Sequence, residues 1–267
     1  MIESKSGRAA VKGSLYIDAT GDGDIAFSAG ARFEQAADHR TERRMTATLM
    51  YRLVGIPRPA ENERRLWVNG ITTSWGPSPN EVDGSDMQSL SAAEREARLA
   101  LIPHIEEWRK TFPEAQLIDT ATILGIRETR RIKGHYTITE DDYISGRQQP
   151  DSIAVSANPV PAYYGQRRFL DHLGFEIPYR CLVPVDLDNL ILAGRCISAC
   201  QPAFQSARSM APLMAISQAA GAAAAMCTSK SCTPAALDVR ELQDLLVKQD
   251  AVIRVPPEER QKGADLA

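Results

Sequence analysis

The alternation of apolar and polar positions is clearest in the last third of the chain, where it predicts a strand, a turn, a loop and a long helix. The apolar run Asn189 to Ala193 is typical of a strand buried in a parallel sheet, and Gly194-Arg195 would end it in a sharp turn. Ser209 can cap the helix, and Pro212 falls in its first turn, where a missing N–H costs nothing.

The segment between this strand and this helix is polar. Residues 196–208 contain Pro202, which disfavours a helix and predicts a loop. The helix from Leu213 to Met226 is rich in alanine, so a backbone, a sheet or a flat ligand can pack closely against it. Because a helix N-terminus carries unpaired N–H groups, its first turn is a candidate for holding an electron-rich group of a cofactor. The alternative is a tightly packed structural βα unit.

A second glycine turn follows an apolar run near the N-terminus. Ser14 to Thr20 predicts a hairpin arm and a buried strand, which Gly21-Asp22-Gly23-Asp24 ends. The two glycines let a ligand approach the backbone, and the carboxylates can accept hydrogen bonds from sugar hydroxyls. The alternative is a turn in which Asp24 caps a helix beginning near Ile25. The 267 residues contain no G-x-G-x-x-G, so they cannot by themselves cradle a dinucleotide in the usual way.

The middle of the chain has a different pattern. Met45 to Ile56 predicts a strand from another layer, and Arg58 to Gln88 predicts a long irregular link. Ser91, with Glu94 three residues later, forms a capping box that predicts the start of a helix. The apolar stripe of that helix would consist of Leu99, Ile102, Ile105 and Trp108, with a kink at Pro103.

The run Ile123 to Tyr136 predicts a strand that carries three arginines. Alternation places Arg127 and Arg131 on one face and Arg130 on the other. Guanidinium groups bind planar anions by two hydrogen bonds, so these arginines are candidates for holding a substrate carboxylate or a ring edge. The alternative is a ladder of ion pairs with Glu128 and neighbouring acids.

End signals predict two further helices. Thr139, followed by three acidic residues, starts one that Gly146 ends, and Asp238 to Val247 is an amphipathic helix. His135 and Tyr136 could act as acids, and a structural role is the alternative for each.

Composition and charge exclude several classes of protein. With 31 basic and 34 acidic residues the net charge is −3, which does not favour nucleic acid or a membrane surface as a partner. We find no apolar run of about 18 residues and no signal peptide, and therefore expect a cytoplasmic protein. The five cysteines form no CxxC pair, so we expect no disulfide framework and no bound metal. Cys196 and Cys200 are either a redox pair or small buried thiols.

Four motifs together resemble the FAD-dependent oxidoreductase family related to the flavoproteins of fumarate reductase and heterodisulfide reductase. They are Ile17 to Asp24, Gly125 to Arg131, Ile177 to Arg180 and Asn189 to Gly221. The resemblance implies an α/β fold: an incomplete FAD/NAD(P)-binding domain of the glutathione-reductase type with an inserted mixed-sheet α+β domain. FAD-domain pieces would span 1–36 and 181–230, the inserted substrate or cap domain 37–180, and a C-terminal helix and tail 231–267.

The resemblance also implies roles for particular residues. The residues near the phosphates and adenosine of FAD would be Thr20, Gly21, Asp22 and Gly23. Gly194 and Arg195 would contact the pyrophosphate or the ribityl chain. Those facing the isoalloxazine ring would be Arg208, Ser209 and Met210, and Arg208, Ser209, Arg127 and Arg131 would contact the ring or the substrate. The chain departs from the family at Asn158 to Tyr163 and at Cys200-Gln201, where relatives often carry a histidine.

The function implied is hydride transfer between a small-molecule substrate and the flavin. The alternative is a non-catalytic fragment or subunit that needs a separate chain carrying the glycine-rich, N-terminal FAD-binding half.

Overall fold

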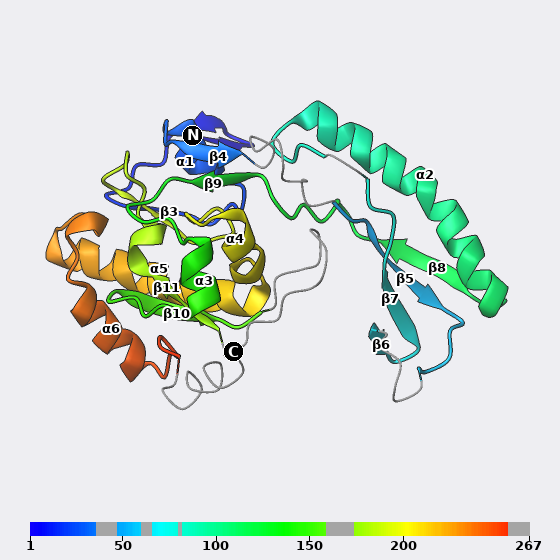
Figure 1. Cartoon of the computed structure of the whole chain (residues 1–267). Coiled ribbons are helices and arrows are strands. Elements are labelled where there is room, and N and C mark those ends of the chain that lie inside the picture. Colours follow the sequence, from blue (N-terminus) through cyan, green and yellow to red (C-terminus); the bar gives the residue numbers. More distant parts are fainter. Residues whose placement is uncertain (36–46, 60–65, 80–81, 159–173, 256–267) are drawn as a thin grey trace, which may run out of the picture. The chain divides into compact units, whose positions relative to one another are not determined.

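The computed structural model describes residues 1–35, 47–59, 66–79, 82–158 and 174–255, which form two compact units. The first comprises Met1–Gln35 and Arg130–Ala267, and the second Ala36–Thr129 (Figure 1). The sequence predicts an insertion that continues to residue 180. In the structure the second unit ends at Thr129, and residues from Arg130 onward belong to the first unit. The reason is that β9 (Arg130–Ile132) pairs antiparallel with β4 (Phe33–Gln35).

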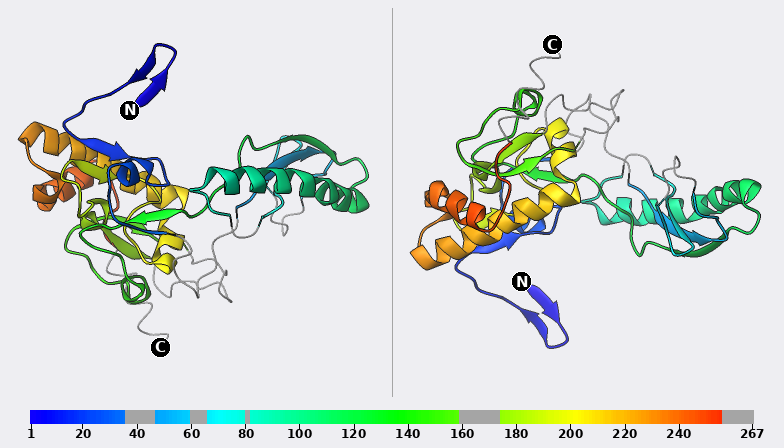
Figure 2. Two further views of the ribbon diagram at one scale, coloured as in Figure 1. Left: turned by 90° about the horizontal axis from the view of Figure 1, so that it is seen from above. Right: turned by 90° about the horizontal axis from the view of Figure 1, so that it is seen from below.

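The first unit contains most of the helices and strands. Its other strands are β1 (Ile2–Ser4), β2 (Gly7–Ala9), β3 (Tyr16–Asp18), β10 (Ser152–Ser156), β11 (Phe175–Pro178) and β12 (Leu190–Leu192). Its helices are α1 (Asp24–Ser28), α3 (Glu140–Ser145), α4 (Gln201–Ala207), α5 (Met210–Lys230) and α6 (Val239–Lys248), with 3-10 turns at Tyr179–Leu182 and Pro234–Ala236. β1 and β2 form an exposed hairpin that projects from the rest of this unit (Figure 2).

β3 and β12 form a parallel pair, with Ile17 opposite Ile191. Ile191 is completely buried, whereas Ile17 is 38% exposed. β3 is therefore not the buried strand that the sequence predicts. Within the described residues β3 pairs with β12 alone, so one edge of this strand has no neighbour.

α5 packs one face against β3, β10 and β12. The buried face is built mainly from alanine and includes Ile216, Ala219, Ala220 and Ala223. Met210, Met214 and Gly221 lie on an exposed face. By length and composition alone α5 could cross a membrane, but core helices of soluble proteins pass the same test, and α5 packs into such a core.

The segment 196–208 corrects the sequence prediction, because it contains helix α4 rather than a loop. Pro202 lies in the first turn of α4, where proline starts a helix instead of breaking it. Five of the residues that follow it, Ala203 to Ala207, are buried. The polar side chains that suggested a loop are thus inside the protein.

The second unit consists of an antiparallel sheet with strand order β6–β7–β5–β8, along which α2 runs (Figure 1). Its elements are β5 (Met50–Val54), β6 (Leu66–Val68), β7 (Ile71–Trp75), α2 (Met87–Thr111) and β8 (Gln116–Thr120). Tyr51 and Leu53 pack against Leu101 of α2. The predicted irregular link, 58–88, instead contains the hairpin of β6 and β7. It turns at Asn69-Gly70, both of which have positive φ.

α2 begins earlier than the sequence predicts and buries a different face. Asp86, not Ser91, is its N-cap, and the Asp86 carboxylate accepts a hydrogen bond from the N–H of Ser89 at 2.7 Å. The buried positions are Ala93, Ala97 and Leu101. Two residues of the predicted stripe, Leu99 and Ile102, are exposed.

Of the remaining predictions of secondary structure, one strand is much shorter than predicted and two helices are confirmed. Only Arg130–Ile132 of the predicted strand from Ile123 to Tyr136 forms β9. The helix after Thr139 is confirmed as α3, with a complete capping box, and Gly146 ends it in the left-handed conformation. The amphipathic helix near the C-terminus is confirmed as α6.

Candidate functional site

The loop after β3 is held by the carboxylate of Asp18, which is completely buried. One oxygen accepts hydrogen bonds from the N–H of Thr20 at 3.1 Å and from its hydroxyl at 2.7 Å. The other accepts from the N–H of Ala26 at 2.9 Å. Gly21 and Gly23 have φ values of 80° and 67°, in the left-handed region that glycine enters without strain. Asp18 is not among the predicted site residues, although it stands two residues before Thr20, a spacing that favours such a turn.

The Gly194-Arg195 turn lies directly against this loop. A Cβ atom added to Gly194 would lie 3.3 Å from Cα of Gly21. The guanidinium of Arg195 forms an ion pair with Asp22. Nε of Arg195 is buried and has no hydrogen-bond partner among the described residues. The structure therefore brings together the predicted phosphate-side residues Thr20, Gly21, Asp22, Gly23, Gly194 and Arg195.

Arg130 of β9 holds the other side of the loop. Its Nη1 donates to Oδ1 of Asp24 at 2.8 Å and to the carbonyl of Asp22 at 3.2 Å. Its guanidinium carbon lies 4.1 Å from the centre of the Phe27 ring. Asp24 is the first residue of α1, whose N-cap is Gly23, so the alternative in which Asp24 is the N-cap is wrong by one residue. Arg130 thus forms an ion pair with Asp24 of α1, whereas the structural alternative predicted ion pairs with Glu128 and neighbouring acids.

The other two arginines of this motif lie in different units. Arg131 is 2% exposed, pairs with Glu34 at 3.3 Å and lies 5.9 Å from the centre of the Phe204 ring in α4. Arg127 is half-buried and belongs to the second unit, as does the buried Glu128. The arginines do not share one strand, because β9 begins only at Arg130.

The predicted ring contacts lie where α4 passes into α5. Arg208 is the C-cap of α4, and Ser209 is the N-cap of α5, although its side chain makes no capping hydrogen bond. Met210 is 82% exposed. The hydroxyl of Ser217 donates to the carbonyl of Ala193 at 3.2 Å, which places the second turn of α5 beside the end of β12. The start of α5 lies about 10 Å further along the helix axis.

α4 also carries a buried carboxamide that the sequence analysis missed. Gln205 is 2% exposed, and neither its amide oxygen nor its amide nitrogen has a hydrogen-bond partner within the described part of the chain. Gln201, one helical turn earlier, is buried as well. The four-residue spacing of the two glutamines is a signal only once the segment is known to be helical.

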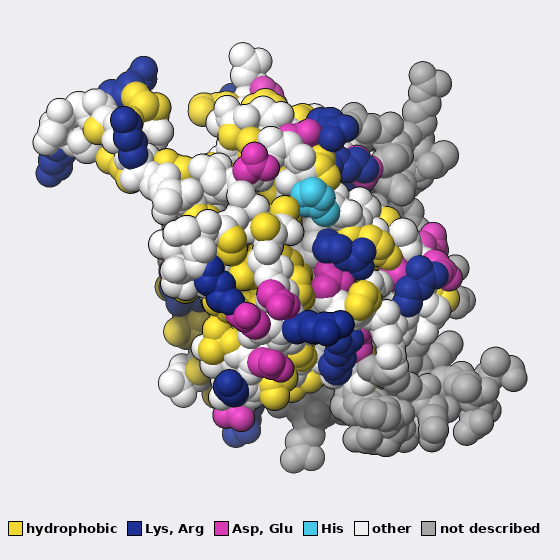
Figure 3. All heavy atoms as spheres, turned by 90° about the vertical axis from the view of Figure 1, so that its left-hand side faces the viewer, with side chains coloured by type: hydrophobic (Ala, Val, Ile, Leu, Met, Phe, Trp, Pro, Cys, Tyr) yellow, Lys and Arg dark blue, Asp and Glu magenta, His cyan; other side chains and the backbone are white. Residues whose placement is uncertain are grey.

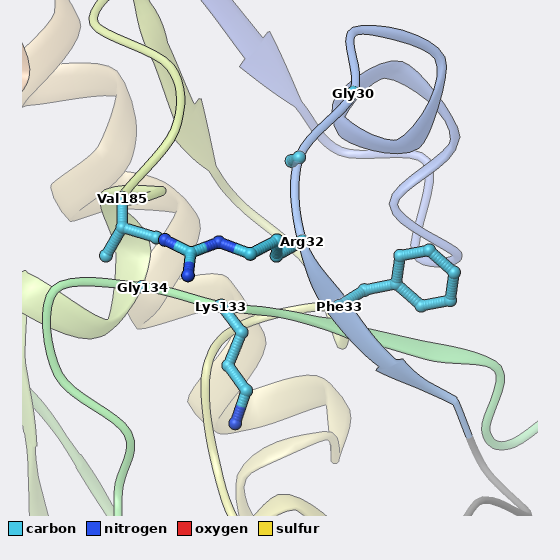
Figure 4. Close-up of a pocket in the computed structure, with 7 residues that line it drawn as sticks. Gly30, Arg32, Phe33, Lys133, Gly134 and Val185 are labelled. Carbon is cyan, nitrogen blue, oxygen red and sulfur yellow. The ribbon is translucent and has the colours of Figure 1, made fainter.

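Two cavities are lined by described residues of the first unit. One of about 650 Å³ borders the first turns of α5 and is lined by Val155, Ala157, Asn158, Ala211, Pro212, Met214, Ala215, Gln218, Ala251 and Val252. The other, of about 630 Å³, is lined by Gly30, Ala31, Arg32, Phe33, Lys133, Gly134 and Val185 (Figure 4).

The second cavity contains two cations, each with an acidic partner. Arg32 extends toward Val185 (Figure 4), and its Nε lies 2.9 Å from Oδ1 of Asp186. Lys133 forms an ion pair with Glu34. Burial raises the pKa of Glu34, but Lys133 and Arg131 outweigh it and lower this pKa overall. The cavity bordering α5 is lined in part by Ala211 and Pro212, which directly follow the predicted ring contacts Ser209 and Met210 in the chain.

One of the two candidate acids, Tyr136, is bound to a carboxylate. The hydroxyl of Tyr136 donates to Asp142 at 2.7 Å, and burial followed by this hydrogen bond raises the pKa of Tyr136. The side chain of His135 is exposed, and the backbone N–H of His135 donates to the carbonyl of Val183 at 2.9 Å. The contact of Tyr136 fits the structural alternative, whereas the role of His135 stays a prediction.

All five cysteines are free thiols. Cys196 is buried, and burial, followed by the nearby Asp18, raises its pKa. Within the described ranges, no group of His, Cys, Asp and Glu side chains is arranged to hold a metal ion. The stretch near Pro159 to Tyr163, where relatives often carry a histidine, lies outside the described residues.

A comparison with protein families agrees with this geometry. The model of the family described as FAD dependent oxidoreductase matches residues 1–74 and 58–246. No curated protein and no solved structure matched the chain. The family match includes both glycine turns and the whole of α5. The chain therefore belongs to the FAD dependent oxidoreductase family, whose members are redox enzymes with FAD as the cofactor.

Proposed function

We propose that this chain carries the flavin-facing part of an oxidoreductase that transfers a hydride between a small-molecule substrate and FAD. When bound, FAD supplies a ring that accepts or donates a hydride at N5. The observation that carries the proposal is the contact between the Gly21 and Gly194 turns, which lie at the end of β3 and β12 beside the second turn of the long helix α5.

The residues at the glycine turns fit the phosphate side of FAD. Gly21 and Gly194 are buried against each other at the end of a parallel strand pair, the position at which α/β proteins bind nucleotides. The buried Nε of Arg195 is a donor without a protein partner in the described residues, and such a donor costs about 1–3 kcal/mol if nothing accepts from it. A phosphate oxygen is a suitable acceptor for this guanidinium.

The start of α5 fits the ring side of FAD. Its first N–H groups have no side-chain cap, and the adjoining cavity has mainly apolar walls such as Val155, Pro212 and Met214. Negative charge near a helix N-terminus is stabilised by about 0.3–1 kcal/mol, and by up to about 2 kcal/mol when partly buried. Arg208 would add a positive charge there. These groups would orient the ring and favour its reduced, anionic form.

The test is the reduction potential of the flavin in the FAD-loaded protein. Because 30 mV corresponds to about 1.4 kcal/mol for two electrons, Arg208→Leu should lower the potential by about 10–40 mV. Arg208→Lys keeps the charge and should keep most of the potential. An unchanged potential in Arg208→Leu would contradict a place for Arg208 beside the ring.

We also propose a second candidate, in which these residues act with a separate chain that carries the glycine-rich FAD-binding half. Two observations favour it. A parallel pair as small as β3 and β12 is not a stable sheet by itself, and Ile17 on the free edge is exposed. The exposed face of α5 contains Ser217, Gly221 and Ala225 at four-residue spacing, which allows a second helix to approach closely.

Flavin retention distinguishes the two candidates. The 267-residue chain is mixed with FAD, passed through a desalting column and examined for flavin absorbance, with and without a glycine-rich half expressed separately. The second candidate predicts flavin on the column-purified protein only when both polypeptides are present. Stoichiometric flavin on the 267-residue chain alone would exclude it and leave the first.

A further inference from the structure

The C-terminal end of α5 places two cysteines against each other. Ser231 has φ 53° and ψ 40°, and the N–H of Cys232 donates to the carbonyl of Cys227 at 3.1 Å. In such a helix end, the residue after the left-handed position folds back onto the residue five positions earlier, and their side chains touch. Here both of those side chains are thiols.

The two thiols differ in their access to solvent. Cys227 is 1% exposed, whereas Cys232 is half-buried. Burial and a hydrogen bond with Cys232 raise the pKa of Cys227 to about 11. The thiol that a reagent meets first is therefore Cys232, and Cys227 lies within hydrogen-bonding reach behind it.

Charged and polar groups around this cap come from three elements. Lys230 of α5 lies close enough to Cys232 to interact with it, and it forms an ion pair with Glu241 of α6. Tyr179 interacts with both cysteines, and its hydroxyl donates to the carbonyl of Pro234 at 3.1 Å. On the face that includes α6, basic and acidic side chains are interspersed (Figure 3).

We propose that Cys227 and Cys232 form a thiol oxidation site that a hydroperoxide converts to an intramolecular disulfide. The Cys232 thiolate attacks one peroxide oxygen, the O–O bond breaks, and the leaving hydroxide takes a proton to become water. The sulfur of Cys227 then displaces the hydroxyl from the Cys232 sulfenic acid. The S–S bond forms, the S–O bond breaks, and a second water leaves with the Cys227 proton. Two thiols and one hydrogen peroxide thus give one disulfide and two waters.

Cys196 and Cys200 provide an internal comparison. They also consist of one buried and one half-buried thiol. Their backbone groups, however, form hydrogen bonds with other residues. The carbonyl of Cys196 accepts from the N–H of Ile132, and the N–H of Cys200 donates to the carbonyl of Ile138. Cys200 is thus a thiol of similar exposure without the backbone hydrogen bond that joins Cys232 to Cys227.

The test is peptide mapping of the whole chain after treatment with hydrogen peroxide and alkylation of the remaining thiols. We expect two of the five thiols to be lost, with a cross-linked peptide that joins Cys227 to Cys232. Cys227→Ser should stop the reaction at a sulfenic acid on Cys232 that dimedone traps, and Cys200→Ser should leave the cross-link unchanged.

Two results would overturn the proposal. One is a cross-link between Cys196 and Cys200 without one between Cys227 and Cys232. The other is oxidation of Cys232 to the sulfonic acid in the wild-type chain with Cys227 still alkylated. Both are read on the wild-type chain, so they do not depend on whether a variant folds.

Discussion

Gly21 and Arg195 are packed so closely that a Cβ atom on Gly21 would lie 2.5 Å from Nη1 of Arg195. The glycine also has a positive φ, so any larger residue there meets both backbone strain and the guanidinium. This relationship joins the two predicted cofactor turns, which stand far apart in the sequence.

Gly21→Ala should therefore both destabilise the protein and weaken FAD binding. Gly30 is a matched control, because its φ is 90° but nothing lies within 4 Å of an added Cβ. Gly30→Ala should cost about 1–2 kcal/mol from strain alone. Gly21→Ala should cost a similar amount, because the atom that its Cβ meets is the far end of the flexible Arg195 side chain, and should reduce FAD affinity about tenfold, because the guanidinium must move. Urea denaturation and flavin titration measure the two effects. Equal FAD affinity of the two variants would contradict a role for this contact in cofactor binding.

Asp18→Asn tests the carboxylate that holds the glycine loop. An amide group in place of one oxygen would face the N–H of Thr20 or of Ala26 and repel it, so we expect a loss of about 2–3 kcal/mol in the free energy of unfolding. Asp188 is exposed and serves as the control, and Asp188→Asn should change stability by less than about 0.5 kcal/mol. Urea unfolding at pH 7 measures both variants, and similar stabilities would show that Asp18 does not organise the loop.

The pair of Tyr136 and Asp142 should make stability depend on pH at both extremes. Burial raises the pKa of Asp142, but hydrogen bonds from Thr139 and Tyr136 and the charge of Arg147 outweigh it, so the pKa falls below 3.8. This contribution is present above the unfolded pKa and is lost as pH falls through the folded one. The pKa of Tyr136 is raised above 10.0, so its contribution is present below pH 10.0 and is lost as pH rises through the raised value.

Tyr136→Phe removes the shared hydrogen bond and should cost about 1.5–3 kcal/mol near pH 7. The loss should become smaller below about pH 4 and above about pH 10, because the wild-type chain loses the same interaction there. Urea midpoints measured from pH 3 to pH 11 test this expectation. A pH-independent difference between the two proteins would contradict it.

Gly221 on the exposed face of α5 tests the proposed helix docking. An added Cβ meets nothing within 4 Å, so Gly221→Ala should stabilise the isolated chain by about 1 kcal/mol. Gly221→Leu should leave that stability intact and prevent close approach of a second helix. Ultracentrifugation with the glycine-rich half is the measurement, and unimpaired association of Gly221→Leu would exclude this face.

The sequence predicts those parts of the fold whose signals are local. Thr139 and Gly146 bound α3 as expected, because capping and left-handed glycine depend on neighbouring residues. The Asn69-Gly70 turn is also a local signal, which the prediction of an irregular link overlooked. Pro202 is a local signal too, because a proline in a first turn is compatible with a helix, whereas the prediction of a loop takes it as a helix breaker.

Other features depend on tertiary contacts and could not be predicted. The face of α2 that is buried is set by its sheet, so alanines rather than the larger Leu99 and Ile102 point inward. The return of Arg130 to the first unit depends on pairing with β4, nearly a hundred residues earlier in the chain. The sequence motifs are sufficient to predict the two glycine turns. The acids that pair with Arg130 and Arg131, Asp24 and Glu34, are far away in the sequence and are seen only in the structure.

Neither polar atom of the buried Gln205 carboxamide has a hydrogen-bond partner among the described residues. Burying a carboxamide in this state opposes folding by about 1–3 kcal/mol, so Gln205→Met, similar in length and free of that penalty, should raise the melting temperature. Natural selection purges such a burden only when the folded state falls below the threshold that activity requires. Gln205 in α4 is therefore a position at which a single substitution should increase thermal stability.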